Sequence, residues 1–324
     1  MQQITIIRQI VILVILALVG FISGKKKHLP ENSGVVLSKF VVKVTLPSLI
    51  FTTLTGYDFS KQEIIDGCIV YICGLVFILF SFVIAKLISD RLKIDDAQKS
   101  IYKMLSTFGN IAYMGFPLLE SLYGNRGLIY AIFFQLANDT LLWTLGIYLV
   151  NRQNTKSWRD NIKHLFNINT LAFAIGIVAI AVNFQELTRR FGLLGTVYKM
   201  VFDALNPLGK STTYISMIFI GLILSKATFR SVSDIFKKYS IFIFSFVKLL
   251  VIPVVAYIVL QFAGRNLDPL VLNVIVLQLA MPAGTIVSAL TAEYNSDYQY
   301  ATEGVFISTV LSVITLPLLL FILK

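Results

Sequence analysis

Apolar residues fall in long runs along this chain, and short polar connections separate them. A helix needs about 20 apolar residues to cross the hydrocarbon core of a bilayer. Ten segments are candidates, of which the sixth is short: residues 4–23, 35–55, 67–88, 101–121, 127–150, 169–184, 206–225, 239–262, 270–291 and 302–323. The polar connections are too short to build a soluble core. The pattern predicts an all-α polytopic membrane protein with ten transmembrane helices.

Two of these spans contain residues that interrupt a helix. The fourth includes "FGNIAYMGFPLLESLYG" (108–124), with Asn110, Gly115 and Pro117, and the ninth includes "MPAGTIVSAL" (281–290), with Pro282 and Gly284. Proline removes one backbone hydrogen bond and clashes with the preceding turn. The freed groups are tolerable in a membrane only inside protein or beside a water-filled cavity. We therefore expect a cavity at mid-membrane, with a second half-helix beginning at each proline.

The ten spans divide into two sets of five. Residues 1–150 form the first repeat, 151–168 a cytoplasmic connection, and 169–324 the second repeat. An odd number of crossings inverts the second copy relative to the first. Each half ends with a proline-broken span, a tyrosine-bearing turn and a long apolar helix. Matching broken spans in two inverted halves indicate where a transporter binds its substrate.

Composition and charge agree with this interpretation. The 324 residues are 56% hydrophobic and 14% charged, with a net charge of +11, whereas soluble domains are about 25% charged. Fourteen basic residues lie in the connections after the first, third, fifth and seventh spans, against six on the opposite side. This bias predicts a multi-pass protein of the cell membrane with both termini outside the cytoplasm. The positive charge therefore reflects topology, and we expect no nucleic-acid partner.

The sequence lacks the motifs that are typical of an enzyme active site or a metal site. Cys68 and Cys73 lie inside an apolar run without supporting ligands, so we interpret them as packing residues. There is neither an H-E-x-x-H motif nor a P-loop. We expect no cofactor, no metal and no enzymatic activity.

The broken spans favour an anionic ligand. Half-helix N-termini at the midplane would present free N–H groups and the positive end of the helix dipole. An asparagine side chain donates two hydrogen bonds, and glycine lets the backbone approach a ligand closely. A carboxylate fits these donors. The candidate substrate-binding residues are Asn110, Gly115, Phe116, Pro117, Asn138, Pro282, Gly284 and Thr285.

Two charged residues lie well inside predicted spans. Each costs at least about 2.5–3.5 kcal/mol on insertion scales, so each needs a reason. Asp139 lies near the centre of the fifth span and is the candidate for ion coupling; the alternative is a purely structural hydrogen bond or ion pair. Lys248, in the eighth span, is a candidate supporting charge that could pair with a carboxylate or extend its stem toward the interface.

Several stretches resemble the auxin efflux carrier family, which includes plant auxin carriers and bacterial organic-acid permeases. "GNIAYMGFPLLESLYG" is similar to its N-x4-G-x-P-L-L span. "KFVVKVTLPSLIF", "FIGLILS", "VKLLVIP" and "MPAGTIVSALTAEYNSD" are similar to its second, seventh, eighth and ninth helices. The resemblance covers almost the whole chain. It matches Asn110 with the family's substrate-contacting asparagine, and Pro117 and Pro282 with its crossover prolines, while Val287 replaces a second proline of many plant members.

The resemblance also implies a fold and a mechanism. The fold is an inverted five-plus-five repeat like that of sodium/bile-acid symporters and sodium/proton antiporters, in which helices four and nine cross as broken pairs. Helices one, two, six and seven form a scaffold, and helices three to five and eight to ten form a transport domain. An elevator-type movement and a homodimer are implied in the same way.

The expected function is secondary transport of small organic anions across a lipid bilayer. Carboxylates such as malate, malonate or an auxin-like acid are the expected substrates. Two alternatives remain: a sodium-coupled symporter of the same fold, and a membrane sensor that does not transport. The residues do not indicate the direction of transport or the coupling ion.

Labelling of an introduced cysteine tests the predicted topology. Asn154 lies in the connection after the fifth span, which the charge bias places in the cytoplasm. An Asn154→Cys variant is expected to resist a membrane-impermeant maleimide in intact cells and to react after lysis. Labelling from outside intact cells would contradict the topology.

Overall fold

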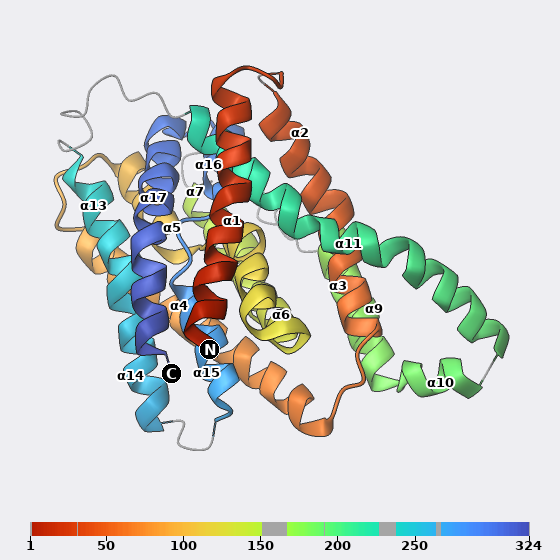
Figure 1. Ribbon diagram of the computed structural model, residues 1–324. Helices are drawn as coiled ribbons and strands as arrows, with labels where there is room; N and C mark the ends of the chain where they lie inside the picture. Colours follow the sequence, from red (N-terminus) through yellow and green to blue (C-terminus); the bar gives the residue numbers. More distant parts are fainter. Residues whose placement is uncertain are drawn as a thin grey trace. The chain divides into compact units, whose positions relative to one another are not determined.

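The computed structural model describes residues 2–30, 32–150, 167–190, 192–226, 238–263 and 267–323. The described chain is helical almost throughout, and Figure 1 labels its helices. Most of the predicted connection 151–168, including Asn154, lies outside the described residues.

The helical elements follow one another along the chain in an order close to the predicted spans. They are α1 (Gln2–Lys25), α2 (Ser33–Phe40), η1 (Val41–Thr45), α3 (Leu46–Thr55), α4 (Lys61–Ser89), α5 (Asp96–Thr107), η2 (Ile111–Gly115), α6 (Phe116–Leu141), η3 (Leu142–Gly146), α7 (Ile147–Val150), α9 (Ile168–Ala181), α10 (Phe184–Arg190), α11 (Gly192–Lys226), α13 (Tyr239–Phe246), η6 (Val247–Val251), α14 (Ile252–Ala263), α15 (Pro269–Leu279), α16 (Thr285–Glu293) and α17 (Tyr298–Ile322), where η marks a π-helical turn.

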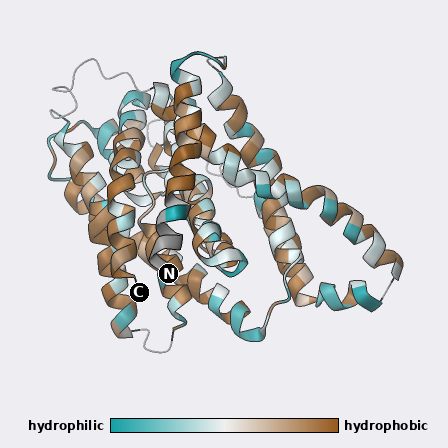
Figure 2. Cartoon of the chain, in the orientation of Figure 1, coloured by the Kyte–Doolittle hydropathy of each residue, from teal (hydrophilic) through white to brown (hydrophobic). Residues whose placement is uncertain are grey.

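The described residues form an all-helical polytopic membrane protein. Six helical segments are long and apolar enough to cross a membrane, or up to seven if the bent pair α9–α10 is one span, and α15 and residues Val11–Lys25 are shorter apolar helices. Figure 2 shows α4, α14 and α17 in brown along much of their length. The fourth and ninth predicted spans are each divided by non-helical residues. The count of ten spans stays a prediction.

Three prolines follow π-helical turns. Each lies two residues after the end of its turn: Pro47 follows η1, Pro117 follows η2 and Pro253 follows η6. Proline lacks an N–H group, and its ring clashes with the carbonyl four residues earlier in an α-helix. A π turn is wider and shifts the hydrogen-bond register, so the chain passes each proline without leaving the helix. Pro207 and Pro317 are exceptions that lie inside α11 and α17 as described.

The breaks therefore do not fall where we expected them. Gly115–Pro117 are helical, and the fourth span is interrupted at residues 108–110 instead. In the ninth span the interruption covers residues 280–284, so α16 begins at Thr285 and not at Pro282. The expectation that a half-helix begins at each proline was wrong, because the helix that contains Pro117 already begins at Ile111 in η2, and Pro282 lies in the non-helical segment before α16.

The chain divides into two compact units. The first consists of Met1–Ile65, Ala112–Ile132 and Phe166–Lys226, and the second of Asp66–Ile111, Phe133–Leu165 and Ala227–Lys324. Each unit is assembled from segments that are distant in the sequence.

In the first unit, α1 lies against α11 through small residues. Gly20 and Gly24 are four residues apart on α1, and Gly221 and Ser225 have the same spacing on α11. A Cβ atom added at Gly20 would overlap the carbonyl oxygen of Ile218, and one added at Gly221 would overlap that of Ala17. The helices thus meet backbone to backbone. Small residues at this spacing are a common way to pack helices in membranes, where close van der Waals contact drives association.

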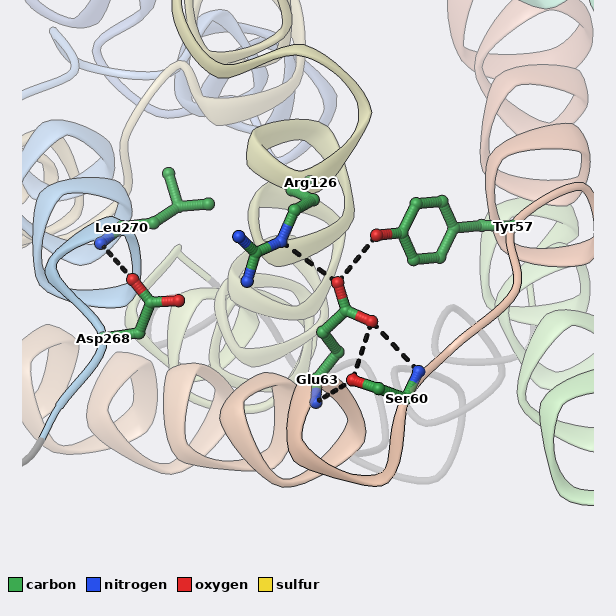
Figure 3. Close-up of polar contacts among 6 residues, drawn as sticks. All are labelled: Tyr57, Ser60, Glu63, Arg126, Asp268 and Leu270. Atoms are coloured by element: carbon green, nitrogen blue, oxygen red, sulfur yellow. Dashed lines mark hydrogen bonds and ion pairs between the residues drawn. The ribbon is translucent and has the colours of Figure 1, made fainter.

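Also in the first unit, Glu63 joins the turn before α4 to α6. Its Oε1 accepts hydrogen bonds from the Tyr57 hydroxyl (2.7 Å) and from Arg126 Nε (3.0 Å), and its Oε2 accepts from the backbone N–H and hydroxyl of Ser60 (Figure 3). Burial and the neighbouring Glu63 carboxylate raise the pKa of Tyr57 to about 12. The phenol therefore stays protonated at neutral pH and keeps donating.

A single added methyl group tests the α1–α11 contact. Gly221→Ala should lower the thermal unfolding midpoint of the detergent-solubilised protein, because overpacking typically costs about 1–3 kcal/mol. Gly192→Ala is the matched control on the same helix, since an added Cβ there meets nothing within 4 Å, and it should leave the midpoint unchanged or raise it. Equal midpoints for the two variants would contradict the close approach.

Candidate functional site

The two interrupted spans pair with each other in the second unit. Gly109 and Ala283 form an antiparallel bridge. The N–H group of Asn110 donates to the carbonyl of Pro282 (2.7 Å), and the N–H group of Gly284 donates to the carbonyl of Phe108 (3.0 Å). Non-helical backbone in a membrane protein must find partners within the protein. Here each break supplies hydrogen-bond partners for backbone groups of the other. We refer to residues 108–110 and 280–284 as the crossover.

The crossover depends on close backbone approach. A Cβ atom added at Gly284 would lie 2.9 Å from the carbonyl oxygen of Gly109, closer than real Cβ contacts come. A third helix also takes part, because the N–H group of Ala283 donates to the Ser308 hydroxyl of α17 (3.1 Å). The predicted site residues Asn110, Pro282 and Gly284 therefore lie together, and Thr285 follows directly as the first residue of α16.

Asn110 is buried at the crossover with an unsatisfied side chain. It is 2% exposed, and neither its Oδ1 nor its Nδ2 has a hydrogen-bond partner among the described residues. A buried polar group without a partner costs about 1–3 kcal/mol, and such groups in native structures call for an explanation. A carboxamide that can both donate and accept at a buried backbone crossing is suited to a polar ligand.

Gln278 has the same character and was missed by the sequence interpretation. It is 1% exposed, and both its Oε1 and its Nε2 lack partners within the described chain. Its backbone oxygen lies 3.6 Å from the position that a Cβ atom on Gly109 would occupy, so it belongs beside the crossover. The signal was a lone glutamine in the apolar run "VIVLQLA", one turn before Pro282.

The side chain of Lys248 lies next to the crossover. This η6 residue is 4% exposed, and its Nζ donates to the carbonyl oxygens of Ser106 (3.1 Å) and Thr107 (3.5 Å). These carbonyls close the last turn of α5, where backbone acceptors have no helical partner and the dipole favours a cation. Lys248 therefore caps α5 one residue before the crossover begins at Phe108.

Asn138 and Asp139 lie in the part of α6 that belongs to the second unit. An Asp139 carboxylate oxygen (Oδ1) accepts a hydrogen bond from Gln135 Nε2 (2.6 Å). Asn138 is 3% exposed, and its Oδ1 has no partner in the described part of the chain. Neither residue is hydrogen-bonded to the crossover within the described residues, and Asp139 has no ion-pair partner there.

Gly115, Phe116 and Pro117 belong to the first unit. Gly115 ends η2, and Phe116 and Pro117 begin α6 as fully or nearly fully buried residues. The structure thus brings together four of the eight predicted binding residues, Asn110, Pro282, Gly284 and Thr285. Gly115, Phe116 and Pro117 are described only within the first unit.

The polar groups at the crossover are suited to hydrogen bonding. Within the described ranges, no group of three or more His, Cys, Asp and Glu side chains is placed to hold a metal ion. Around the crossover the polar groups are carboxamides, hydroxyls, backbone amides and one ammonium group. Such groups can bind and orient a small polar or anionic molecule.

Comparison with known proteins places this chain in a family. The profile of the family described as "Membrane transport protein" matches residues 5–159 and 155–320. An uncharacterized transporter of Methanothermobacter thermautotrophicus is 28% identical over 308 residues, which is 94% of either chain. The uncharacterized transporters MJ1031 of Methanocaldococcus jannaschii and YfdV of Escherichia coli are 25% and 23% identical, over 317 and 318 residues; these matches cover 95% and 96% of this chain, and 96% and 95% of the relatives. The chain therefore belongs to the membrane transport protein family, that of the auxin efflux carriers, and is a multi-pass membrane transporter.

Proposed function

We propose that this transporter is a secondary carrier of small organic anions, with its binding site at the crossover. The observation that carries the proposal is the buried carboxamide of Asn110, which has no hydrogen-bond partner among the described residues and lies where the two breaks pair. The proposed substrates are short carboxylates such as malate or malonate, with an auxin-like acid as a further member of the class.

The groups near the crossover favour negative charge. Asn110 and Gln278 can each donate hydrogen bonds to a carboxylate. The first amides of α16 receive no side-chain cap, since Gly284 stands at the N-cap, and the N-terminus of a helix attracts anions. The Lys248 side chain adds a hydrogen-bond donor beside the turn that precedes the crossover. Hydrogen bonds to a charged partner are the stronger ones, so a carboxylate gains more here than a neutral ligand.

The proposed mechanism is elevator-type alternating access in an inverted five-plus-five repeat of ten spans. In it, helices three to five and eight to ten carry the substrate past a scaffold of helices one, two, six and seven. The division of the chain into two compact units, each assembled from distant segments, supports separate moving parts, but residues 112–132 of the fourth and fifth spans group with the first, second, sixth and seventh spans. A homodimer in the cell membrane, with both termini outside the cytoplasm, completes the proposal.

Transport by purified protein in liposomes distinguishes this function from its alternatives. Uptake of a radiolabelled carboxylate supports a carrier, whereas binding without transport of any acid supports a sensor. Dependence of uptake on a sodium gradient would identify the sodium-coupled symporter instead.

Substitution of Asn110 tests the proposed binding site. Asn110→Ala should weaken carboxylate binding by about ten- to hundredfold, because a hydrogen bond to a charged group is worth roughly 1.5–3 kcal/mol. Binding is measured by calorimetric titration of the purified protein. Asn273→Ala is the matched control, since it truncates a buried asparagine of α15 in the same unit. An unchanged affinity in a folded Asn110→Ala variant would remove this residue from the site.

Substitution of Asp139 tests whether it is the proton-coupling residue. Its half-buried carboxyl group lies in a membrane span and has no ion-pair partner among the described residues, so a change of protonation need not break an ion pair. Asp139→Asn keeps the size of the side chain but removes titration. The variant should retain substrate exchange in liposomes and lose accumulation driven by an imposed pH gradient.

Asp96→Asn is the control for this experiment, because it removes an aspartate whose side chain is 92% exposed at the start of α5. It should behave as the parent does. If Asp139→Asn still concentrates substrate with the parent's pH dependence, Asp139 has a structural role only.

A further inference from the structure

A second candidate site lies in the first unit, away from the crossover. A cavity of about 520 Å³, open to the surface, is lined by α10, the first turns of α11 and the turn at Gly56. Its polar lining consists of Gln185, Thr188, Arg189, Thr196, Tyr198 and Lys199. Nothing in the transport chemistry of the crossover uses these residues.

Local geometry explains why a cavity forms here. The chain bends by 66° between α9 and α10, at a corner where Asn183 adopts a left-handed conformation (φ 53°), which asparagine tolerates better than most residues. A Cβ atom added at Gly195 would overlap the carbonyl oxygen of Thr188. This close approach holds α11 against α10 and closes one side of the cavity.

The electrostatics of the cavity favour an anion. Arg189 and Lys199 line it, and no acidic residue is among the described residues that do so. Asp58 comes within 3.8 Å of Arg189, but both side chains are 70% exposed, and such pairs contribute about 1 kcal/mol or less. The hydroxyl groups of Thr188 and Thr196 donate to backbone oxygens. The guanidinium and ammonium groups are therefore the strong donors that a ligand meets.

An apolar stripe runs beside this basic lining on α11. Leu193, Val197, Met200 and Val201 follow helical spacing, and their side chains are between 43% and 82% exposed. The lining residues Thr196 and Lys199 fall on the neighbouring face of the same turns. In Figures 1 and 2, α10 carries hydrophilic residues while the adjoining part of α11 is largely brown. The surface is thus amphiphilic, with positive charge in the cavity and apolar side chains along its edge.

The length of α11 places this surface near the membrane boundary. The helix has 35 residues, which span about 50 Å at 1.5 Å per residue, whereas the hydrocarbon core is about 30 Å thick. The sequence pattern assigns the span to residues 206–225. The turns before Pro207 therefore exceed what a crossing needs and suit the interfacial region, where lipid phosphates lie.

We propose that the cavity binds the phosphate headgroup of an anionic phospholipid, with Arg189 and Lys199 contacting the phosphate and an acyl chain lying along the stripe of Leu193, Val197, Met200 and Val201. The same chemistry would accept a free phosphate ester, but the exposed apolar stripe favours the lipid. The site is independent of substrate binding at the crossover.

Lipid titration of the full-length protein in a non-ionic detergent tests this site. Native mass spectrometry records the fraction of protein that carries palmitoyl-oleoyl phosphatidylglycerol, phosphatidylcholine or, as the soluble arm, glycerol phosphate. Phosphatidylglycerol should bind with the highest affinity. Arg189→Gln and Lys199→Gln should each weaken its binding by about fivefold, the attraction expected for one basic residue near an anionic surface.

Arg190→Gln is the matched control. Arg190 is the neighbouring arginine, pairs with Glu186 and does not line the cavity, so its loss removes the same charge without touching the proposed site. It should leave the affinity for phosphatidylglycerol unchanged. Unfolding midpoints in the same detergent without added lipid verify that all variants are folded.

Four results would overturn the proposal. They are equal affinity for phosphatidylglycerol and phosphatidylcholine, an equal effect of Arg190→Gln and Arg189→Gln, and glycerol phosphate binding as tightly as the lipid, which would identify a soluble anion as the ligand. The fourth is a Leu193→Asn variant that dissociates an oligomer while its lipid affinity is unchanged, which would assign this surface to a second copy of the chain.

Discussion

The structure depends on one constraint: backbone groups that leave a helix inside a membrane must find hydrogen-bond partners in the protein, because hydrocarbon offers none. The second unit meets this constraint by pairing two interruptions. Asn110 donates to Pro282, and Gly284 donates to Phe108, so two defects that would each be costly alone satisfy part of each other's backbone. The Ser308 hydroxyl and the Lys248 ammonium group satisfy further groups at the edges. Among the buried side chains that lack a hydrogen-bond partner within the described residues are two carboxamides beside the crossover, those of Asn110 and Gln278.

Prolines elsewhere in the chain meet the same constraint without a break. In η1, η2 and η6 a widened turn precedes the proline, and the helix continues. Where the chain only has to pass a proline, a π turn is sufficient. At the crossover, by contrast, the chain leaves the helix. The lack of a side chain on Gly284 lets its backbone approach that of Gly109 closely.

Much of the fold could be predicted from the sequence, because hydrophobic runs identify helices in a membrane protein and glycine and proline identify the two interrupted spans. The location of the fourth-span break could not, since Pro117 gave the stronger signal, and the π turn that accommodates it depends on hydrogen-bond register rather than residue type. The partner of Lys248 also escaped prediction: a carboxylate was the expected alternative, and carbonyls at the end of α5 take its place. Gln278 was overlooked because one uncharged polar residue in an apolar run gives no distinctive pattern, and only its burial beside the crossover makes it a candidate.

Hydrogen–deuterium exchange with a bound carboxylate tests most directly whether the paired breaks form the anion site. The amides of Thr285 and Ile286 begin α16 without a side-chain cap, so a carboxylate at the crossover would accept hydrogen bonds there and exclude water from both breaks. Addition of saturating malonate or malate should slow exchange in peptides that cover 105–115 and 278–288 together, and the Asn110→Ala variant should lose this protection at the same ligand concentration. Protection confined to other helices, in a protein that transports the same acid, would contradict the account.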